Sequence, residues 1–407
     1  MSQEKLEELN EHQLSPNNAL SADQIAFIQQ HLLDAPASLL LKYGKTKAFE
    51  IEQIEARQKA KLKLPAWVAI PDLIFPKVVS VEQSSSEPTA RYKASLISGQ
   101  LLIDATGGMG IDTYFFSKHS QSVIYIEQNP VLVHHARHNF SVLKAKNIRC
   151  ISGNSLDFLR QWTGKADWLY LDPARRASGN RRVIALTDCE PDVMANWSLL
   201  RQKARHLLIK ASPLLDIKQT LLTLPAISRV HVVAIENECK ELLFELSEEA
   251  STQPHCLITT INFKNDGTQQ VFNFDWEEET NTVVALSNPA RYVYEPNVAI
   301  LKAGAFKAIA KQYQLAKIAA HSHLYTSANL VSDFPGRLFE VLAVVKADFK
   351  ALVPFLPAGK ANLTLRNFPG TTDELRKKLK LKEGGDVYLL ATTLSNGDKR
   401  LLVCKKA

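Results

Sequence analysis

The chain has 407 residues, of which 45% are hydrophobic and 22% are charged, and its formal net charge is +7. This length suggests roughly two to four domains, and the composition excludes a largely disordered chain. No uninterrupted apolar stretch reaches the ~18–20 residues of a membrane-spanning helix, and the polar, acidic start is unlike a targeting peptide. The five cysteines form no C-x-x-C pair, so we expect neither a disulfide framework nor a structural zinc site, and a reducing, cytoplasmic location is favoured.

Residues 1–90 are predicted to form an N-terminal helical region. Ser21 and Gln24 have the spacing of a capping box before a run of helical periodicity. Pro36 should end this first helix, because proline disfavours a helical conformation in the residue before it. A second helix is expected over Ile51–Leu64, which is rich in Glu, Gln, Ala and Lys.

Residues 91–288 alternate short β-rich apolar runs with segments of helical length. This alternation predicts a mostly parallel sheet with helices on both faces. Cys256–Phe263 and Leu242–Leu246 are expected to add antiparallel strands, and Asn265–Thr268 has the composition of a hairpin turn. The main strand candidates are Leu101–Ala105, Val123–Glu127, Ile148–Ser152, Trp168–Asp172, His206–Lys210 and Val230–Ile235.

Residues 289–407 form a basic C-terminal segment. They carry 19 Lys and Arg against 9 Asp and Glu, a net charge of +10, whereas the rest of the chain carries 30 against 33, a net charge of −3. Such asymmetry suggests a polyanionic partner, most often nucleic acid, although a solvated basic surface has the same composition. Asp373–Leu381 is predicted to be a basic helix that Gly384 and Gly385 stop. The cations expected to bind RNA are Arg366, Arg376, Lys377, Lys378 and Lys380.

The run Asp104-Ala105-Thr106-Gly107-Gly108-Met109-Gly110-Ile111-Asp112 follows a predicted strand and opens a helix. Glycines in such a turn let the backbone approach a ligand closely, and Glu127 ends the next strand, where ribose hydroxyls of a nucleoside would lie. A dinucleotide fingerprint requires a third glycine or an alanine, but Thr113 stands there. The acid Asp104 suits a cationic ligand better than a phosphate, and S-adenosylmethionine is such a ligand.

From about residue 90 to residue 250, these features resemble the class I S-adenosylmethionine-dependent methyltransferases. The resemblance implies a Rossmann-like α/β fold with a mixed seven-stranded sheet, one strand of which is antiparallel. Asn154 stands where many relatives have an acid, and its other interpretation is a helix N-cap. The implied cofactor-binding residues are Asp104, Thr106, Gly107, Gly108, Gly110, Asp112, Glu127, Gln128, Asn154 and Ser155.

The run Asp172-Pro173-Ala174-Arg175 ends the fourth predicted strand. It resembles the Asp/Asn-Pro-Pro-aromatic motif of nucleic-acid amino-methyltransferases, in which the acid and a proline carbonyl accept hydrogen bonds from the target amine. The resemblance implies catalytic roles for Asp172, Pro173 and Arg175, although Ala174 replaces the second proline and Arg175 the stacking aromatic residue. The related 5-methyluridine enzymes need a cysteine nucleophile, and the corresponding run Lys210–Pro213 contains none.

Runs on both sides of the sheet region extend this likeness over most of the chain. They include Tyr292–Asn297, Leu324–Ser327, Phe334–Arg337 and Arg366–Gly370. The ensemble resembles a bacterial family in which a class I methyltransferase precedes a small α+β THUMP-like domain, an RNA-binding module. The implied domains are residues 1–90, 91–288 and 289–407.

The resemblance implies an S-adenosylmethionine-dependent methyltransferase acting on RNA at a base nitrogen, with guanine N2 as the first candidate and no metal. The RNA species stays open. The main alternative is an RNA-binding protein that keeps the cofactor fold without turnover. A dehydrogenase and a methyltransferase acting on a protein or a small molecule are further alternatives.

Overall fold

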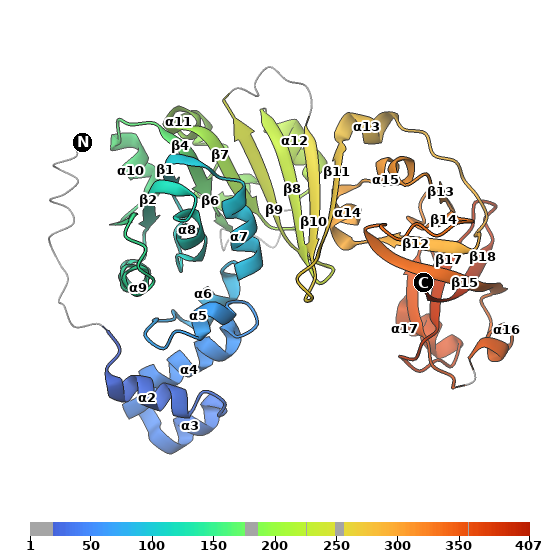
Figure 1. Cartoon of the computed structure of the whole chain (residues 1–407), viewed down its shortest axis with the longest axis horizontal. Coiled ribbons are helices and arrows are strands. Elements are labelled where there is room, and N and C mark those ends of the chain that lie inside the picture. The colour runs from blue at the N-terminus through green and yellow to red at the C-terminus, as the bar shows by residue number, and fades with distance from the viewer. Residues whose placement is uncertain (1–18, 176–185, 225, 249–255, 357) are drawn as a thin grey trace. The chain divides into compact units, whose positions relative to one another are not determined.

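The structure is a computed structural model that describes residues 19–175, 186–224, 226–248, 256–356 and 358–407 (Figure 1). The chain is divided into two compact units. The first contains residues up to 227 together with 244–252, and the second contains residues 228–243 and 253–407. Within the described ranges, no helix combines the length and hydrophobicity that crossing a membrane requires. The domain boundaries at residues 90 and 288 stay a prediction.

The described residues that precede the first sheet form only helices and their connecting segments, as predicted. Ser21 and Gln24 form the expected capping box, with the backbone N–H of Gln24 donating to Ser21 Oγ. Buried Arg57 donates to the carbonyls of Pro71 and Leu73, and so holds residues 70–77, the proline-rich segment, against its helix. The helices are α2 (Ala22–Gln30), α3 (Pro36–Tyr43), η1 (Gly44–Lys47), α4 (Ala48–Ala60), α5 (Pro65–Val68), α6 (Val78–Gln83) and α7 (Glu87–Ser95).

The first sheet has nine strands in the order β11-β10-β8-β9-β7-β4-β1-β2-β3, whereas seven were predicted. The hairpin of β10 and β11 accounts for the difference, because it continues the sheet beyond β8. The strands are β1 (Gly99–Asp104), β2 (Ser120–Glu127), β3 (Ile148–Ser152), β4 (Ala166–Leu171), β7 (Ala204–Ala211), β8 (Ile227–Ile235), β9 (Glu238–Ser247), β10 (Leu257–Phe263) and β11 (Gln269–Asp275).

Strand directions agree with the sequence except at β10. Strands β1–β4 and β7 pair in parallel, which confirms the predicted parallel core. A two-residue turn at Glu236 and Asn237, both with positive φ, joins β8 to β9, so β9 runs antiparallel to β8. The prediction that 256–263 is antiparallel to its neighbours is half wrong, because β10 pairs in parallel with β8 and antiparallel only with β11.

Helices and short elements connect these strands. Figure 1 shows α8 and α9 beside β2, which they contact. Asn139 of α9 hydrogen-bonds both the N–H and the carbonyl of Ile74, at 2.8 Å each, and so fastens the proline-rich segment to this helix. The connecting elements are α8 (Ile111–Phe116), α9 (Pro130–Val142), α10 (Ser155–Gln161), β5 (Ala174–Arg175), η2 (Leu186–Asp188), β6 (Cys189–Glu190), α11 (Trp197–Lys203) and α12 (Ile217–Thr223).

The second unit contains another sheet, with seven strands in the order β13-β14-β12-β15-β18-β17-β16. Pairing is antiparallel except between β16 and β17. The elements are α13 (Trp276–Asn281), β12 (Tyr292–Pro296), α14 (Val298–Ala303), α15 (Ala308–Gln312), β13 (Ala316–Lys317), β14 (Tyr325–Ser327), β15 (Gly336–Lys346), α16 (Phe349–Leu352), η4 (Val353–Phe355), β16 (Asn362–Arg366), α17 (Thr372–Lys378), β17 (Tyr388–Thr393) and β18 (Lys399–Lys406).

The basic helix α17 is shorter than predicted. It begins with a capping box between Thr371 and Glu374 and ends at Lys378, so Gly384 and Gly385 do not stop it. Lys380 has a positive φ of 52° and therefore lies beyond the helix. Leu375 of the helix and Leu379 and Leu381 beyond it are buried in one hydrophobic cluster.

Candidate functional site

The predicted cofactor residues lie where the parallel strands β1, β2 and β3 end. Register places Asp104 of β1 opposite Tyr125 of β2, and Glu127 of β2 opposite Ser152 of β3. Asp172 directly follows β4, which pairs with β1. Because the carboxyl ends of parallel strands meet at one edge of the sheet, the fold gathers these three carboxylates there.

The glycine turn between β1 and α8 is held by contacts that leave no room for a side chain at Gly107 or Gly110. A Cβ at Gly107 would overlap the ring of Tyr125, and one at Gly110 would lie 2.7 Å from Phe140 Cζ. Gly108 and Gly110 have φ values of 53° and 84°, which glycine adopts without strain. Tyr125 Oη donates to the Gly108 carbonyl at 2.7 Å. Sequence and contacts together thus fix the turn in one conformation.

Replacing Gly107 by alanine is expected to lower the free energy of unfolding by ~1–3 kcal/mol, because the new methyl group overlaps the buried Tyr125 ring. It should also displace the turn. Urea unfolding measures the first effect, and calorimetry with S-adenosylhomocysteine the second. The control is Gly44→Ala: its Cβ meets no atom within 4 Å, although φ is 61°, so it should lose stability by strain and leave cofactor affinity unchanged. Equal losses of affinity in both variants would contradict the account.

Asp104 is a buried carboxyl group with two hydrogen-bond donors. Its Oδ1 accepts the Thr106 N–H at 3.0 Å, and its Oδ2 accepts the Thr113 hydroxyl at 2.5 Å. Burial, with a smaller contribution from the charges of Asp112 and Asp172, raises the pKa of Asp104 to about 7 against the lowering effect of these two donors. The charge of this carboxyl is therefore only partly balanced by the chain itself, and a ligand cation beside it would favour ionisation.

Replacing Asp104 by asparagine is expected to change the pH dependence of stability. The raised pKa means that the folded chain holds this proton between about pH 4 and 7 while the unfolded chain has lost it. As the pH rises over that interval, Asp104 therefore lowers the free energy of unfolding of the wild type. The asparagine variant does not show this decrease. Relative to wild type, the variant should gain stability with rising pH, by at most ~4 kcal/mol. Urea unfolding at a series of pH values tests this, and a pH-independent difference would contradict it.

Glu127 bridges the turn and the start of α9. Its Oε2 accepts the Gly108 N–H at 2.9 Å, and its Oε1 accepts the Asn129 N–H at 2.8 Å. Each carboxylate oxygen has a further lone pair, so the half-buried group can still accept hydrogen bonds from two vicinal hydroxyls. This geometry suits the predicted ribose contact.

The other predicted cofactor residues have different surroundings. Asn154 caps α10, and its Oδ1 accepts the backbone N–H groups of Leu156 and Asp157, so its interpretation as an N-cap is confirmed. Gly153 connects this cap to the site, because its N–H donates to the Glu127 carbonyl at 3.0 Å. Ser155 begins α10, and Gln128 is exposed directly after β2.

Asp112 faces a buried cluster that the sequence analysis did not predict. Lys93 of α7 has no exposed side-chain area and lies 3.1 Å from Asp112 Oδ1, while Ser85 and Tyr170 donate to Oδ2 at 2.8 Å. Burial opposes ionisation of Asp112, but Lys93 and Lys210 outweigh it and lower its pKa. The oxygens of Asp112 thus fasten α7 to α8 beneath the glycine turn.

Asp172 is joined to both the glycine turn and β7. Its backbone N–H donates to Thr106 Oγ1 at 2.6 Å, and its Oδ2 accepts from Lys210 Nζ at 2.5 Å. The Lys210 side chain is 13% exposed and that of Asp172 36%, so the lysine lies beneath the acid and the acid faces outward. Lys210 therefore sets the orientation of Asp172. The sequence analysis missed it; its position at the end of the fifth predicted strand was the available signal.

The remainder of the Asp172 motif is described in part. Pro173 is half-buried, and Ala174 and Arg175 form strand β5, paired with Glu190 and Cys189 of β6. The Arg175 side chain lies outside the described residues, as do the neighbouring Arg181 and Arg182.

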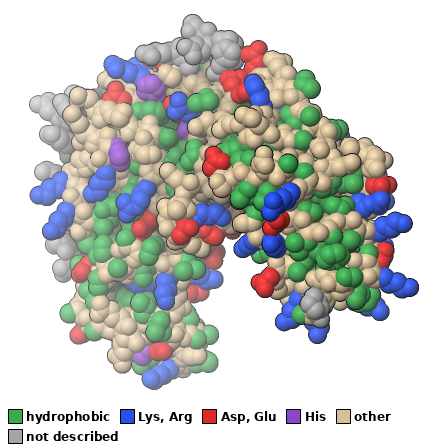
Figure 2. All heavy atoms as spheres, turned by 45° about the vertical axis from the view of Figure 1, so that its right-hand side comes forward, with side chains coloured by type: hydrophobic (Ala, Val, Ile, Leu, Met, Phe, Trp, Pro, Cys, Tyr) green, Lys and Arg blue, Asp and Glu red, His purple; other side chains and the backbone are tan. Residues whose placement is uncertain are grey.

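The cations predicted to bind RNA fall into two groups. Arg366 donates to buried Glu295 at 2.7 Å, and Arg376 pairs with Asp373 and Glu383. The three others, Lys377, Lys378 and Lys380, are exposed. Figure 2 shows Lys and Arg side chains spread over the C-terminal unit. A cavity of about 560 Å³ in this unit is lined by Phe368, Glu374, Asp398 and the cations Lys346, Lys378, Lys399 and Arg400.

Known proteins resemble both parts of the chain. Residues 292–335 match the model of a ferredoxin-like domain, and residues 336–406 match that of a THUMP-like domain. One similar crystal structure is that of an assigned methyltransferase from Porphyromonas gingivalis W83. The two sequences are 34% identical, and the structures superpose with a TM-score of 0.85 over 95% of this chain and 98% of that chain. An uncharacterized S-adenosylmethionine-dependent methyltransferase of Mycobacterium tuberculosis is 22% identical over 362 residues, 88% of this chain and 95% of the relative. An uncharacterized RNA methyltransferase of Thermotoga maritima is 28% identical over 102 residues, 25% of this chain and 23% of the relative.

Strand order, glycine turn and strand-end carboxylates define a class I methyltransferase domain. With the full-length likeness to the Porphyromonas structure, the chain belongs to the family of S-adenosylmethionine-dependent methyltransferases that carry a C-terminal THUMP-like domain. The resemblance stated from the sequence is thereby confirmed.

Proposed function

We propose that this protein transfers a methyl group from S-adenosylmethionine to a base nitrogen of RNA, with guanine N2 as the first candidate. The observation that carries the proposal is the hydrogen-bonded chain from Asp104 through Thr106 to Asp172 and Lys210. It connects the strand end that suits a cationic cofactor to the acid that suits an amine. The cofactor-binding residues and Asp172 therefore keep a fixed separation, and methyl transfer in line with the breaking bond requires this.

The residues available to the cofactor fit its chemistry. S-adenosylmethionine, when bound, supplies a methyl group on a sulfonium centre that is already activated. Glu127 would accept hydrogen bonds from the ribose hydroxyls, and Asp104 would offset positive charge near the glycine turn. Gln128, Asn154 and Ser155 are proposed to contact the adenine, since they follow the ends of β2 and β3.

The acceptor amine is proposed to lie against Asp172. This carboxylate and the Pro173 carbonyl would accept hydrogen bonds from the amine and aim its lone pair at the methyl group. Lys210, 2.5 Å from Asp172 Oδ2, holds the carboxylate in place, and Oδ1 would be the oxygen that accepts from the amine. The nitrogen becomes positively charged on methylation, and Asp172 or water takes the released proton. The target base must leave its stack to reach this site.

RNA as the substrate class is supported by the C-terminal unit. A THUMP-like domain is matched there, the net charge of residues 289–407 is +10 (19 minus 9), and three exposed lysines follow one another closely around the end of α17. The Thermotoga relative is described as an RNA methyltransferase. We propose Lys377, Lys378 and Lys380 as phosphate contacts, and Arg366 and Arg376 as contacts that also depend on their acidic neighbours.

One observation favours the alternative of an RNA-binding protein without turnover. Ala174 and Arg175 stand in place of the second proline and the stacking aromatic residue. A guanidinium plane stacks on a base less well than an aromatic ring does, although it can also hold a phosphate.

Mass spectrometry of nucleosides from RNA of a deletion strain tests both functions. The proposal predicts the loss of one base-methylated nucleoside, first of all N2-methylguanosine, and its return with the wild-type gene but not with Asp172→Ala. If the deletion strain instead lacks a different base methylated on nitrogen, only the assignment to guanine N2 would have to be changed. An unchanged set of methylated nucleosides in every RNA class would overturn the proposal in favour of the binding protein.

A further inference from the structure

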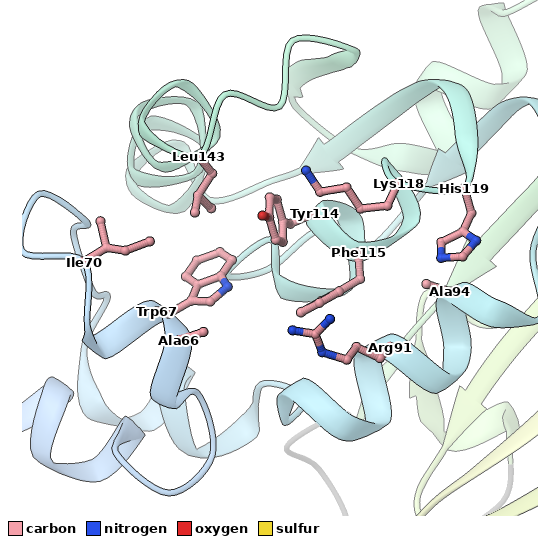
Figure 3. Close-up of a pocket in the computed structure, with 10 residues that line it drawn as sticks. All are labelled: Ala66, Trp67, Ile70, Arg91, Ala94, Tyr114, Phe115, Lys118, His119 and Leu143. Carbon is pink, nitrogen blue, oxygen red and sulfur yellow. The ribbon is translucent and has the colours of Figure 1, made fainter.

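A second cavity lies in the first unit, lined by residues outside the cofactor and acceptor site. Its volume is about 300 Å³, at the lower end for small-molecule pockets. Short helix α5, helices α7 and α8 and the residue that caps α9 surround it, as Figure 3 shows. The side chains that matter for its chemistry are Trp67, Arg91, Tyr114, Phe115, Lys118 and His119.

Aromatic rings and cations alternate around this cavity. Trp67 and Tyr114 meet edge to face with centroids 5.7 Å apart, and Tyr114 and Phe115 do so at 5.3 Å. The Arg91 guanidinium lies 4.9 Å from the Phe115 centroid, and the Lys118 ammonium 4.5 Å from that of Tyr114. Rings with adjacent cations form the arrangement that proteins use to stack a base and hold its phosphate.

Trp67 brings an unused donor to the cavity. Its side chain is buried, and Nε1 has no hydrogen-bond partner among the described residues. Figure 3 shows this nitrogen on the side of the indole that faces Arg91 and Phe115. A buried N–H without an acceptor is costly. Nε1 has almost no exposed area, so a ligand acceptor reaches it only when the side chains at the cavity wall shift.

The charge around the cavity favours an anionic ligand. Two cations, Arg91 and Lys118, line it, and none of the described residues that line it is Asp or Glu. The nearest acid to Arg91 is Glu87, 3.9 Å away, and this carboxylate also accepts the Ala66 N–H at 2.7 Å. Glu87 is therefore shared between two donors and neutralises Arg91 only in part, while Lys118 is exposed.

We propose that this cavity binds one nucleotide of a single-stranded RNA segment, at a position other than the methylated base. The base would stack within the aromatic rings and accept the Trp67 N–H, and its phosphate would lie between Arg91 and Lys118. A free nucleotide has the same chemistry; the choice of an RNA chain rests on the proposed function. The site would add a second anchor on the N-terminal side of the chain, so that RNA binding does not depend on the C-terminal unit alone.

Fluorine NMR of the full-length protein labelled with 5-fluorotryptophan tests this inference locally. The chain has five tryptophans, and Trp67→Phe identifies the resonance of Trp67. Titration with the single-stranded pentaribonucleotide GACUA should move this resonance saturably, with at least ~tenfold higher affinity than guanosine 5′-monophosphate, because several phosphates contribute. The resonance of Trp197 in α11 is the internal control and should stay in place.

Variants separate the site from general charge effects. Arg91→Gln combined with Lys118→Gln should weaken the RNA titration at least ~tenfold, whereas Lys146→Gln, an exposed lysine outside the cavity, should not. Affinity for S-adenosylhomocysteine, measured in parallel, should be unchanged, so a failure of the methyltransferase proposal is seen separately. A Trp67 resonance unmoved by either ligand would overturn the site, and equal affinity for the free nucleotide would overturn the RNA assignment.

Discussion

Replacing Asp172 by alanine should lower the rate of methyl transfer to RNA at least ~100-fold, while the affinity for S-adenosylhomocysteine changes by less than about threefold. The carboxylate is 36% exposed and is held by Lys210, whose side chain is only 13% exposed. Its loss would remove the proposed hydrogen bond to the amine and a proposed acceptor for the proton of the amine. The backbone contact to Thr106 does not depend on the side chain, so the cofactor turn should survive. Single-turnover transfer of labelled methyl groups and calorimetry provide the two readouts.

Two further variants make this result specific. Asp172→Asn keeps one acceptor oxygen and should be less damaged than the alanine variant. Glu248→Gln removes an exposed ion pair to Lys165, 2.7 Å long, and should leave the rate unchanged. Full activity of Asp172→Ala, with Glu248→Gln equally active, would remove Asp172 from the mechanism.

Replacing Glu127 by glutamine should weaken binding of both S-adenosylmethionine and S-adenosylhomocysteine by ~10–100-fold, because hydrogen bonds to a charged acceptor contribute ~1.5–3 kcal/mol. In the variant an amide NH₂ faces either Gly108 N–H or Asn129 N–H, both of which the carboxylate now accepts. The ribose hydroxyls also lose a charged acceptor. Calorimetry with each ligand measures the effect.

Stability must be measured beside affinity, because Glu127 also supports the turn. Unfolding in urea shows whether the variant is folded at the titration temperature. Glu82→Gln, an exposed acid 3.7 Å from Lys59, provides the matched loss of one negative charge. If Glu127→Gln and Glu82→Gln bind both ligands as the wild type does, the ribose assignment is wrong.

The part of the site that sequence could predict is the part encoded by local patterns. A strand, a glycine turn, a helix and an acid at the next strand end lie within 24 residues, Asp104 to Glu127. The structure places Glu127 against Gly108 as this pattern indicates. The capping box at Ser21 was predictable for the same reason, since both of its partners lie within one turn.

Long-range side-chain pairs could not be predicted this way. Lys210 is 38 residues from Asp172 in the sequence. Its position at the end of a predicted strand indicates the same sheet edge but not that the two side chains pair. Buried Lys93 and its partner Asp112 lie on different helices, and likewise no local pattern in the sequence indicates that they pair. Similarly, the parallel pairing of β10 with β8 depends on which sheet edge is free, and this is a property of the whole fold.

The end of α17 illustrates a local prediction that tertiary packing overrides. Gly384 and Gly385 were predicted to end the helix, but it ends earlier, at Lys378, and Lys380 has a positive φ. Burying Leu379 and Leu381 in the same cluster explains the earlier end, because a continued helix would turn these two positions to different faces.

Calorimetric titration of the wild-type protein with S-adenosylmethionine and S-adenosylhomocysteine tests the strand-end pocket most directly. We expect one saturable site for each ligand on the full-length chain, weakened in parallel by Glu127→Gln. A protein that is folded by urea unfolding and gives no binding heat with either compound at several temperatures would contradict the account.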